Sequence, residues 1–208
     1  LVLGNLDISD AGLPLISDTA ILAGAANDEA VFQPEFSPDG RYLAYVSDRR
    51  GWSDVWLYDL ATKAHRCLDE AEGDVSMPAW IQGIRVIGFS ADSRHLLFTR
   101  TAGGCRRAYR CPLEGDEGAT PVEALAAYTR GEQIAPNPNG ESFACIASSN
   151  EISPRVLSVR RNRSRIHARS TSENLQPEEL AVPKPVEWTA DNGDPVYGLY
   201  YPPPIHDR

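Results

Sequence analysis

The sequence predicts an all-β fold: a partial β-propeller of about three four-stranded antiparallel blades, followed by a β-hairpin. The first observation is a turn-plus-strand unit at residues 36–47, Phe-Ser-Pro-Asp-Gly-Arg-Tyr-Leu-Ala-Tyr-Val-Ser. Its proline, aspartate and glycine suit successive positions of a tight turn, and the aromatic and β-branched residues after them favour a buried strand. The second observation is that this unit returns. The third is that the strand after it returns at the same spacing.

The turn-plus-strand unit has two further copies. Residues 89–98 repeat it, and Asp92 stands 53 residues after Asp39. Residues 137–146 form a weaker copy, in which Asn139 follows Asp92 by 47 residues. A period near fifty that is built from strands and turns is typical of propeller blades.

The second strand of the unit keeps the same period. Residues 54–60 are echoed by residues 107–113, where Tyr109 follows Trp56 by 53 residues, and again by residues 154–159. Because two independent anchors share one offset, the sequence predicts repeated blades rather than isolated hairpins.

The repeat divides the chain into six segments. We expect the end of a preceding blade at 1–30, blades at 31–77, 78–130 and 131–171, a linker at 172–185, and the start of an α/β-hydrolase domain at 186–208. The expected strands are 31–36, 41–47, 53–60 and 64–68 in the first blade, 84–89, 94–100, 106–113 and 121–127 in the second, and a last strand at 165–169 in the third. Residues 173–180 suggest a short polar helical turn, after which Pro183 and Pro185 favour extended chain.

The stretch 186–204 differs from the blades. It reads as a strand, an Asn192-Gly193 turn and a second strand, with apolar residues alternating on both arms. A hairpin without a counterpart in the repeat predicts that a new domain begins here.

Composition narrows the possible partners. The chain has 208 residues, 42% of them hydrophobic and 24% charged, and a net charge of −9. This charge disfavours binding to nucleic acids and to anionic membranes, and no apolar run approaches the roughly twenty residues of a membrane helix. The chain starts at Leu1 without a basic-then-apolar leader pattern, so we expect an interior piece of a longer polypeptide.

The cysteines predict no metal site and no cofactor. Cys67, Cys105, Cys111 and Cys145 form no C-x-x-C pair, and only His65 lies near one of them. Free buried thiols fit a reducing compartment, so we expect a cytoplasmic protein. A disulfide between Cys105 and Cys111 across a predicted hairpin remains an alternative.

Arginines cluster in the third blade. Six of them lie between residues 155 and 169, namely Arg155, Arg160, Arg161, Arg163, Arg165 and Arg169. One interpretation is a phosphate-binding face, and the other is a solvated hairpin whose arginines offset nearby carboxylates.

These segments resemble the prolyl oligopeptidase family of serine peptidases, in its acylaminoacyl-peptidase-like branch. Residues 36–45 and 54–60 resemble its propeller blades, which TolB-like propellers share. Residues 185–204 are similar to the hairpin, E-W-T-x-x-(D/N)-G-x-x-(V/I)-x-G-x-x-x-x-P, by which that family enters its catalytic domain. The resemblance covers the chain from about Val31 onward.

The resemblance implies a propeller that caps a Ser-Asp-His triad in the hydrolase domain, with the serine on a G-x-S-x-G elbow. Residues 51–55, Gly-Trp-Ser-Asp-Val, come nearest to such an elbow, but Val55 replaces its last glycine. This near match also falls between two blade strands, so Ser53 is expected to be a loop serine. We expect the triad to lie beyond Arg208, and no catalytic, cofactor-binding or metal-binding residue in this chain.

No other residue completes a catalytic set. His65, His95, His167 and His206 lie on predicted strands, loops or the tail, and His95 replaces Tyr42 in the repeat. Family members hold a peptide N-terminus with propeller carboxylates, for which Glu35, Asp48, Glu132 and Glu141 are the candidates here. A solvated role is the alternative for each.

Two functions therefore stay open. The chain is either a non-catalytic propeller segment that gates a peptidase and meets peptide substrates through the hydrolase domain, or a TolB-like interaction module without enzymatic activity. Three blades and a part cannot close a ring of four or more. Because open blade faces and edges are exposed, we expect self-association or a proteolytic remnant.

Overall fold

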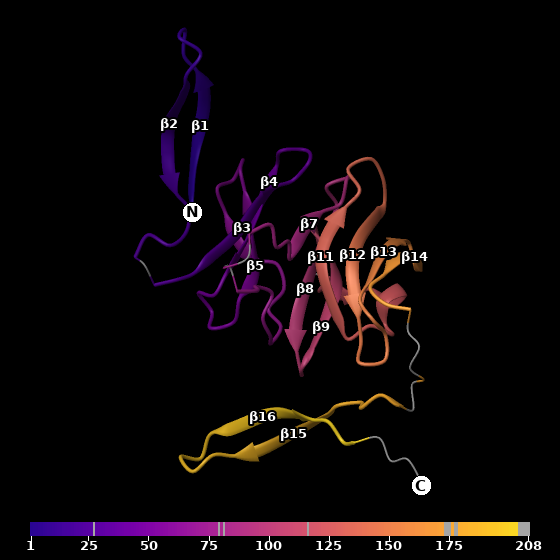
Figure 1. Cartoon of the computed structure of the whole chain (residues 1–208). Coiled ribbons are helices and arrows are strands. Elements are labelled where there is room, and N and C mark those ends of the chain that lie inside the picture. The colour runs from indigo at the N-terminus through magenta and orange to yellow at the C-terminus, as the bar shows by residue number, and fades with distance from the viewer. Residues whose placement is uncertain are drawn as a thin grey trace.

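The computed structural model describes residues 1–26, 28–78, 80, 82–115, 117–172, 176 and 179–203. It confirms the all-β fold: the described residues form antiparallel sheets and one 3₁₀ turn (Figure 1). No helix among them is long and apolar enough to cross a membrane.

The first blade is a four-stranded antiparallel sheet. Its strands are β3 (Val31–Phe36), β4 (Tyr42–Ser47), β5 (Asp54–Asp59) and β6 (His65–Cys67), paired in chain order. All four lie within one residue of the expected ranges, because turn residues mark each end of these strands.

The second blade contains β7 (Ile87–Phe89), β8 (His95–Ala102), β9 (Cys105–Pro112) and β10 (Thr120–Pro121). The strand expected at 121–127 is wrong: β10 ends at Pro121, and a 3₁₀ turn, η1 (Glu123–Leu125), follows. The proline has no N–H to continue the ladder, and the turn buries Leu125 against the third blade.

The third blade contains β11 (Arg130–Pro136), β12 (Ser142–Ser148), β13 (Arg155–Arg160) and β14 (Arg163–Arg169). Its last strand begins two residues before the expected position. A parallel bridge between Arg130 and Arg106 joins β11 to β9, so the second and third blades form one continuous sheet.

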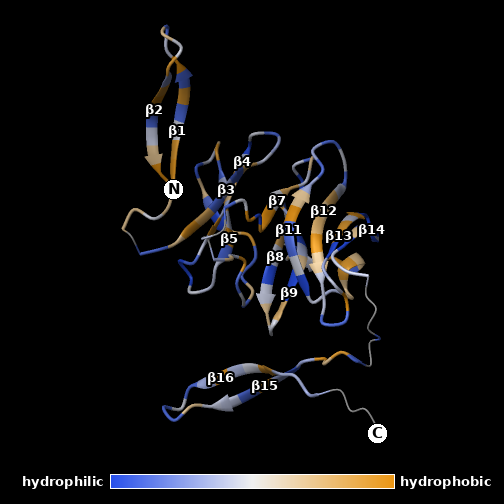
Figure 2. Cartoon of the chain, viewed as in Figure 1, coloured by the Kyte–Doolittle hydropathy of each residue, from blue (hydrophilic) through white to orange (hydrophobic). Residues whose placement is uncertain are grey.

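Two apolar cores hold the blades face to face. One packs β4 and β5 against β7 and β8, with Val46, Leu57 and Phe98 almost fully buried. The other packs the second blade against the third around Ile134 and Leu157. Figure 2 shows the apolar stretches of β7, β11 and β12 that supply these cores.

Glutamine side chains tie the inner strands of neighbouring blades. Gln33 lies at a β-bulge with φ of 45°, accepts a hydrogen bond from the Val86 N–H at 2.6 Å and donates to the Ile87 carbonyl at 3.0 Å. Gln133, at a bulge of β11, accepts from the Arg85 N–H at 3.0 Å. The inner strand of the second blade is therefore held from both sides.

Two hairpins lie outside the blades (Figure 1). One is formed by β1 (Val2–Ile8) and β2 (Pro14–Ile21), and the other by β15 (Lys184–Thr189) and β16 (Pro195–Tyr200). The second hairpin begins two residues before its expected start, so Pro185 belongs to a strand rather than to the linker. The helical turn expected at 173–180 lies largely outside the described residues, as does His206.

Candidate functional site

The repeated turns serve folding rather than chemistry. Ser37 Oγ donates to Asp39 Oδ1 at 2.6 Å, and Ser90 Oγ donates to Asp92 Oδ1 at the same distance. These hydroxyl donors hold the pKa of both carboxyls below the ordinary value, so the carboxylates stay ionised within their turns. The Asp39 N–H also donates to Ser93 Oγ at 3.0 Å, which joins the turns of two blades.

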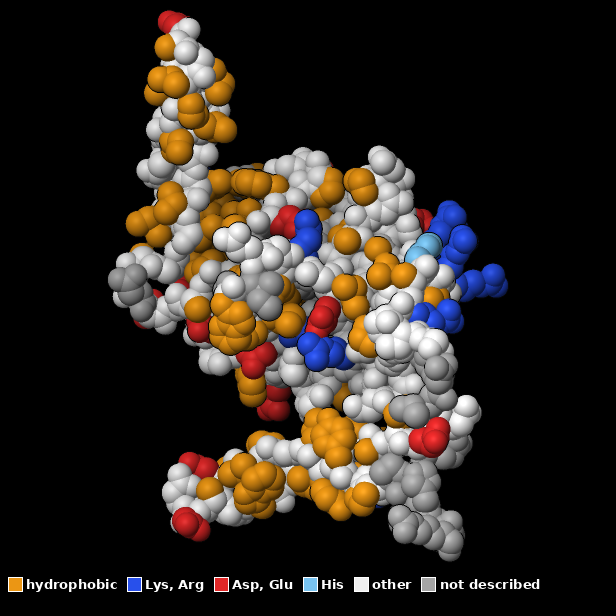
Figure 3. All heavy atoms as spheres, viewed as in Figure 1, with side chains coloured by type: hydrophobic (Ala, Val, Ile, Leu, Met, Phe, Trp, Pro, Cys, Tyr) orange, Lys and Arg blue, Asp and Glu red, His pale blue; other side chains and the backbone are white. Residues whose placement is uncertain are grey.

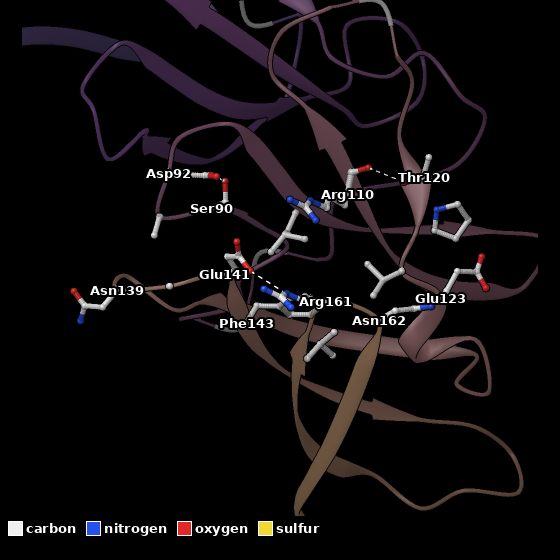
Figure 4. A pocket seen from close by; sticks show the side chains of 16 residues that line it. Ser90, Asp92, Arg110, Thr120, Glu123, Asn139, Glu141, Phe143, Arg161 and Asn162 are labelled. Carbon is white, nitrogen blue, oxygen red and sulfur yellow. Dashed lines mark hydrogen bonds and ion pairs between the residues drawn. The ribbon is translucent and has the colours of Figure 1, made fainter.

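A pocket of about 590 Å³ lies between the second and third blades at the end that carries these turns (Figure 4). We call it the turn-end pocket. Leu97, Phe143 and Val159 give it an apolar floor. Arg110 comes from β9 and Arg161 from the β13–β14 turn, so both blades contribute a guanidinium to it.

Charges of both signs line the turn-end pocket. Arg110 Nη2 lies 3.0 Å from His95 Nδ1, and burial, assisted by Arg110, lowers the pKa of His95. Arg161 lies 3.5 Å from Glu141, and both side chains are exposed. Because these charged groups pair with protein side chains and with solvent, this pocket defines no single chemistry.

A second pocket, of about 750 Å³, lies at the opposite end of the blades, next to the hairpin β15–β16. We call it the hairpin-side pocket. One wall comes from the segment 74–78, the β8–β9 turn, the start of β11 and the β12–β13 loop. The other comes from Val182, Pro183, Pro185, Leu199 and Tyr201. Leu199 packs on Gly104, where an added Cβ would lie 3.1 Å from Leu199 Cδ2. This contact seats the hairpin on the second blade.

Arg106 supports the propeller wall of the hairpin-side pocket. Its buried guanidinium donates to the carbonyls of Val75 and Ser76 at 2.6 and 3.2 Å and to Thr101 Oγ1 at 2.9 Å. Burial lowers the pKa of this guanidinium to about 10. Because its Nη donors are used by the protein, Arg106 positions the wall rather than offering a free charge.

The propeller wall carries an ion pair and most of the pocket's hydroxyls. Arg130 pairs with Glu132 at the start of β11. The hydroxyl-bearing side chains on both walls are Ser76, Thr101, Thr129, Ser148, Ser149 and Tyr201. The opposite wall is largely apolar, with Val182, Pro183 and Leu199. This arrangement suits a ligand that has hydrogen-bonding groups on one side and an apolar body on the other.

Ser53 is a buried structural serine. Its Oγ donates to Asp74 Oδ1 at 3.0 Å and accepts from the Ser76 N–H at 2.9 Å. These bonds fasten the β4–β5 loop to the segment that leads into the second blade. Its hydroxyl contacts no imidazole among the described residues.

One hydrogen bond between a serine hydroxyl and an imidazole ring occurs in the described part of the chain, and the sequence did not point to it. Ser158 Oγ lies 2.7 Å from His167 Nε2 on the exposed outer hairpin of the third blade. No carboxylate is recorded on His167 there, and neither residue lines the two pockets described above. The pair lacks the third group and the enclosed site that acyl transfer needs.

The four candidate carboxylates are not brought together. Arg85 binds both carboxylate oxygens of Glu35 at 2.8 Å. Asp48 accepts from the Ala30 N–H at 2.7 Å. Glu132 lines the hairpin-side pocket and Glu141 the turn-end pocket. Of the four, only Glu132 therefore lies beside the hairpin β15–β16.

The cysteines are free thiols, so the alternative disulfide between Cys105 and Cys111 is absent from the structure. Burial raises the pKa of the Cys111 and Cys145 thiols to about 11 and about 12. Cys105 is half-buried and lines the hairpin-side pocket. No group of three or more His, Cys, Asp or Glu side chains that could hold a metal ion occurs within the described ranges.

The fold and the pocket define the class of protein: a segment of a β-propeller with an additional hairpin, β15–β16, next to the β8–β9 turn. The structure resembles puromycin hydrolase, with a TM-score of 0.79 and 25% identity over 96% of this chain and 29% of that one. It also resembles a puromycin-hydrolysing peptidase of Mycobacterium tuberculosis, with a TM-score of 0.75 and 19% identity over 94% of this chain and 28% of that one. The resemblance to the propeller region of prolyl oligopeptidase family peptidases is therefore confirmed.

The sequence also resembles a second kind of propeller. It is 44% identical to the Tol-Pal system protein TolB of Xanthomonas oryzae pv. oryzae over 45 residues, which are 22% of this chain and 10% of that protein. No family model matches the chain. The matched regions thus cover less than a third of the length of each of these proteins.

Proposed function

We propose that this chain is a non-catalytic propeller segment of a serine peptidase and forms one wall of the chamber in which the substrate is held. The observation that carries the proposal is the contact of Leu199 on β16 with Gly104 of the second blade, which places the hairpin β15–β16 along one side of the hairpin-side pocket. In this arrangement the hairpin leads into the catalytic domain, and the blades narrow the approach to it.

The pocket indicates how such a wall would act. Its hydroxyls and the Arg130–Glu132 pair offer hydrogen bonds to amide groups, while Leu199 and its neighbours cover an apolar side chain. A peptide-like substrate with one apolar residue fits both walls. The solved relatives named for acting on puromycin support a small amide substrate.

The thiols of this chain provide a test. Cys105 lines the hairpin-side pocket, and Cys67, also half-buried, lies on β6 of the first blade. We expect millimolar puromycin or a short apolar peptide to slow alkylation of Cys105 by iodoacetamide and to leave Cys67 unchanged, as measured by peptide mass mapping. If both ligands leave the Cys105 rate unchanged, the pocket is not a substrate wall.

The chain itself should not hydrolyse peptides or esters, because Ser53 is held by Asp74 and by the Ser76 N–H. Hydrolysis that is lost in Ser53→Ala would contradict this assignment.

A second candidate is a TolB-like interaction module without catalytic activity, which the local identity with TolB favours. A binding propeller has no need for the hairpin β15–β16 on its loop end. The alkylation experiment separates the two functions, because an interaction module predicts no protection of Cys105 by small amides.

A further inference from the structure

The outer edge of the third blade differs from the outer edges of the other two. Its last strand, β14, has seven residues, whereas β6 has three and β10 has two. All residues of β14 except Ile166 are exposed. Within the described chain β14 pairs only with β13, so one side of its backbone faces solvent. Propeller edges are usually short, because a long open edge can pair with another polypeptide.

Three arginines of this edge share one face. Arg160 pairs directly with Arg163, and Ser158 pairs with Arg165, so these side chains project to the same side of the sheet. Ile166 pairs with Leu157 on the other side, where both pack on the apolar core. Figure 3 shows the blue side chains gathered at this edge of the molecule.

Three positive charges at this edge lack a carboxylate partner among the described residues. Arg161 lies 3.5 Å from Glu141, with both side chains exposed. For Arg160, Arg163 and Arg165, no carboxylate partner is recorded within the described ranges. Like charges placed opposite each other destabilise a sheet, yet Arg160 faces Arg163 in a chain whose net charge is −9. The edge therefore combines unpaired backbone groups of β14 with a positively charged face.

We propose that β14 binds an acidic, extended polypeptide segment, which adds to the third blade as a further strand. Backbone hydrogen bonds to the open edge would supply register, and alternate acidic side chains would meet the arginines, which follow the same two-residue period. A nucleic acid could meet the arginines but not the backbone ladder, and the net charge of −9 opposes it. A second copy would set arginines against arginines, so self-pairing at this edge is disfavoured.

The test uses the 208-residue chain and a fluorescein-labelled eight-residue peptide of alternating glutamate and threonine. Anisotropy titrations compare the wild type with Arg163→Glu/Arg165→Glu and with a matched control, Lys63→Glu/Arg94→Glu, which makes the same charge change on exposed turns of the other blades. We expect the edge variant to weaken binding by about tenfold or more, and the control by less than about twofold. If the edge variant melts early, Arg163→Gln/Arg165→Gln replaces it.

A second arm separates strand addition from charge attraction. The same peptide with N-methyl groups at alternate residues keeps its charge but loses backbone donors, and we expect its affinity to fall about tenfold. Amide exchange at residues 163–169 should slow when the unmethylated peptide binds. The proposal fails if the control variant weakens binding as much as the edge variant does, or if N-methylation has no effect. It also fails if a single-stranded oligonucleotide displaces the peptide and binds more tightly, or if sedimentation shows copies of the chain pairing through β14.

Discussion

Arg106 shows how one buried charge can hold three segments together. Its guanidinium on β9 reaches the carbonyls of residues 74–76, which link the first and second blades, and the hydroxyl of Thr101 on β8. Nothing in the sequence distinguishes it among twenty basic residues, because its partners are the Thr101 hydroxyl and backbone carbonyls some thirty residues away. Its importance follows from packing alone.

Arg106→Ala should lower the free energy of unfolding by about 2–4 kcal/mol, because several buried carbonyls lose their donor. The loss for Arg106→Lys should be smaller than that for Arg106→Ala but still measurable, since lysine keeps the charge but not the fork of donors. Urea denaturation measures both, with Arg107→Ala as the neighbouring control, for which we expect less than about 1 kcal/mol. Equal losses for Arg106→Ala and Arg107→Ala would show that the carbonyl network is unimportant.

His65 links stability to pH. Tyr45 accepts from Arg49 Nη2 at 2.9 Å, and its hydroxyl lies 2.8 Å from His65 Nδ1, to which it donates when the imidazole is neutral. Burial, with a smaller contribution from Arg49, lowers the pKa of His65 below 6.5 in the folded chain. The unfolded state therefore binds this proton more readily, and stability is lost as pH falls from 6.5 toward the folded value.

We expect the free energy of unfolding to be lower at pH 5.5 than at pH 7.5, and this drop to shrink in His65→Asn. His95 contributes in the same direction, because burial lowers its pKa too. Carboxyls whose pKa is lowered, such as Glu29, lose their contribution only below about pH 4.5, outside this window. Urea titrations at the two pH values measure the drop, and an unchanged drop in His65→Asn would remove His65 from this role.

At the scale of elements, glycine permits the inner strands to approach. Gly88 on β7 lies against Pro136 at the end of β11, and an added Cβ would lie 2.6 Å from two ring carbons of that proline. The sequence predicted a strand at 84–89 but none at 130–136, and it did not predict that these segments touch, because contact between blades depends on how their faces pack.

Gly88→Ala should therefore lower the free energy of unfolding by about 1–3 kcal/mol through overpacking. Gly118→Ala is the matched control, since an added Cβ there meets nothing within 4 Å. Thermal denaturation of the two variants measures the difference. If Gly88→Ala and Gly118→Ala have the same melting temperature, the inner strands can move apart to accommodate the methyl group without a loss of stability.

At the scale of the molecule, the hairpin β1–β2 projects from the blades with one apolar face uncovered (Figures 1 and 3). Val2 pairs with Ile21 and Leu6 with Ile16, and all four side chains are exposed. A two-stranded hairpin with such a face is marginal in water on its own. We propose that it mediates self-association of the chain.

Leu6→Glu/Ile16→Glu should shift the chain toward monomer in sedimentation velocity. Asn5→Glu/Ser17→Glu, the adjacent cross-strand pair on the opposite face, should leave association unchanged. A wild-type chain that stays monomeric over the whole concentration range would contradict the proposal.

The sequence alone determined the blades. Turn residues and two-residue alternation are local properties, so the repeat placed the strands of the first blade within one residue. It failed at residues 121–127, where contacts with the third blade favour a 3₁₀ turn. Three features became visible only in the folded chain: Leu199 packs on Gly104, Arg106 holds the wall of the hairpin-side pocket, and three arginines share one face of an open edge. These relations join residues distant in the chain or depend on strand register, which packing sets and local sequence does not.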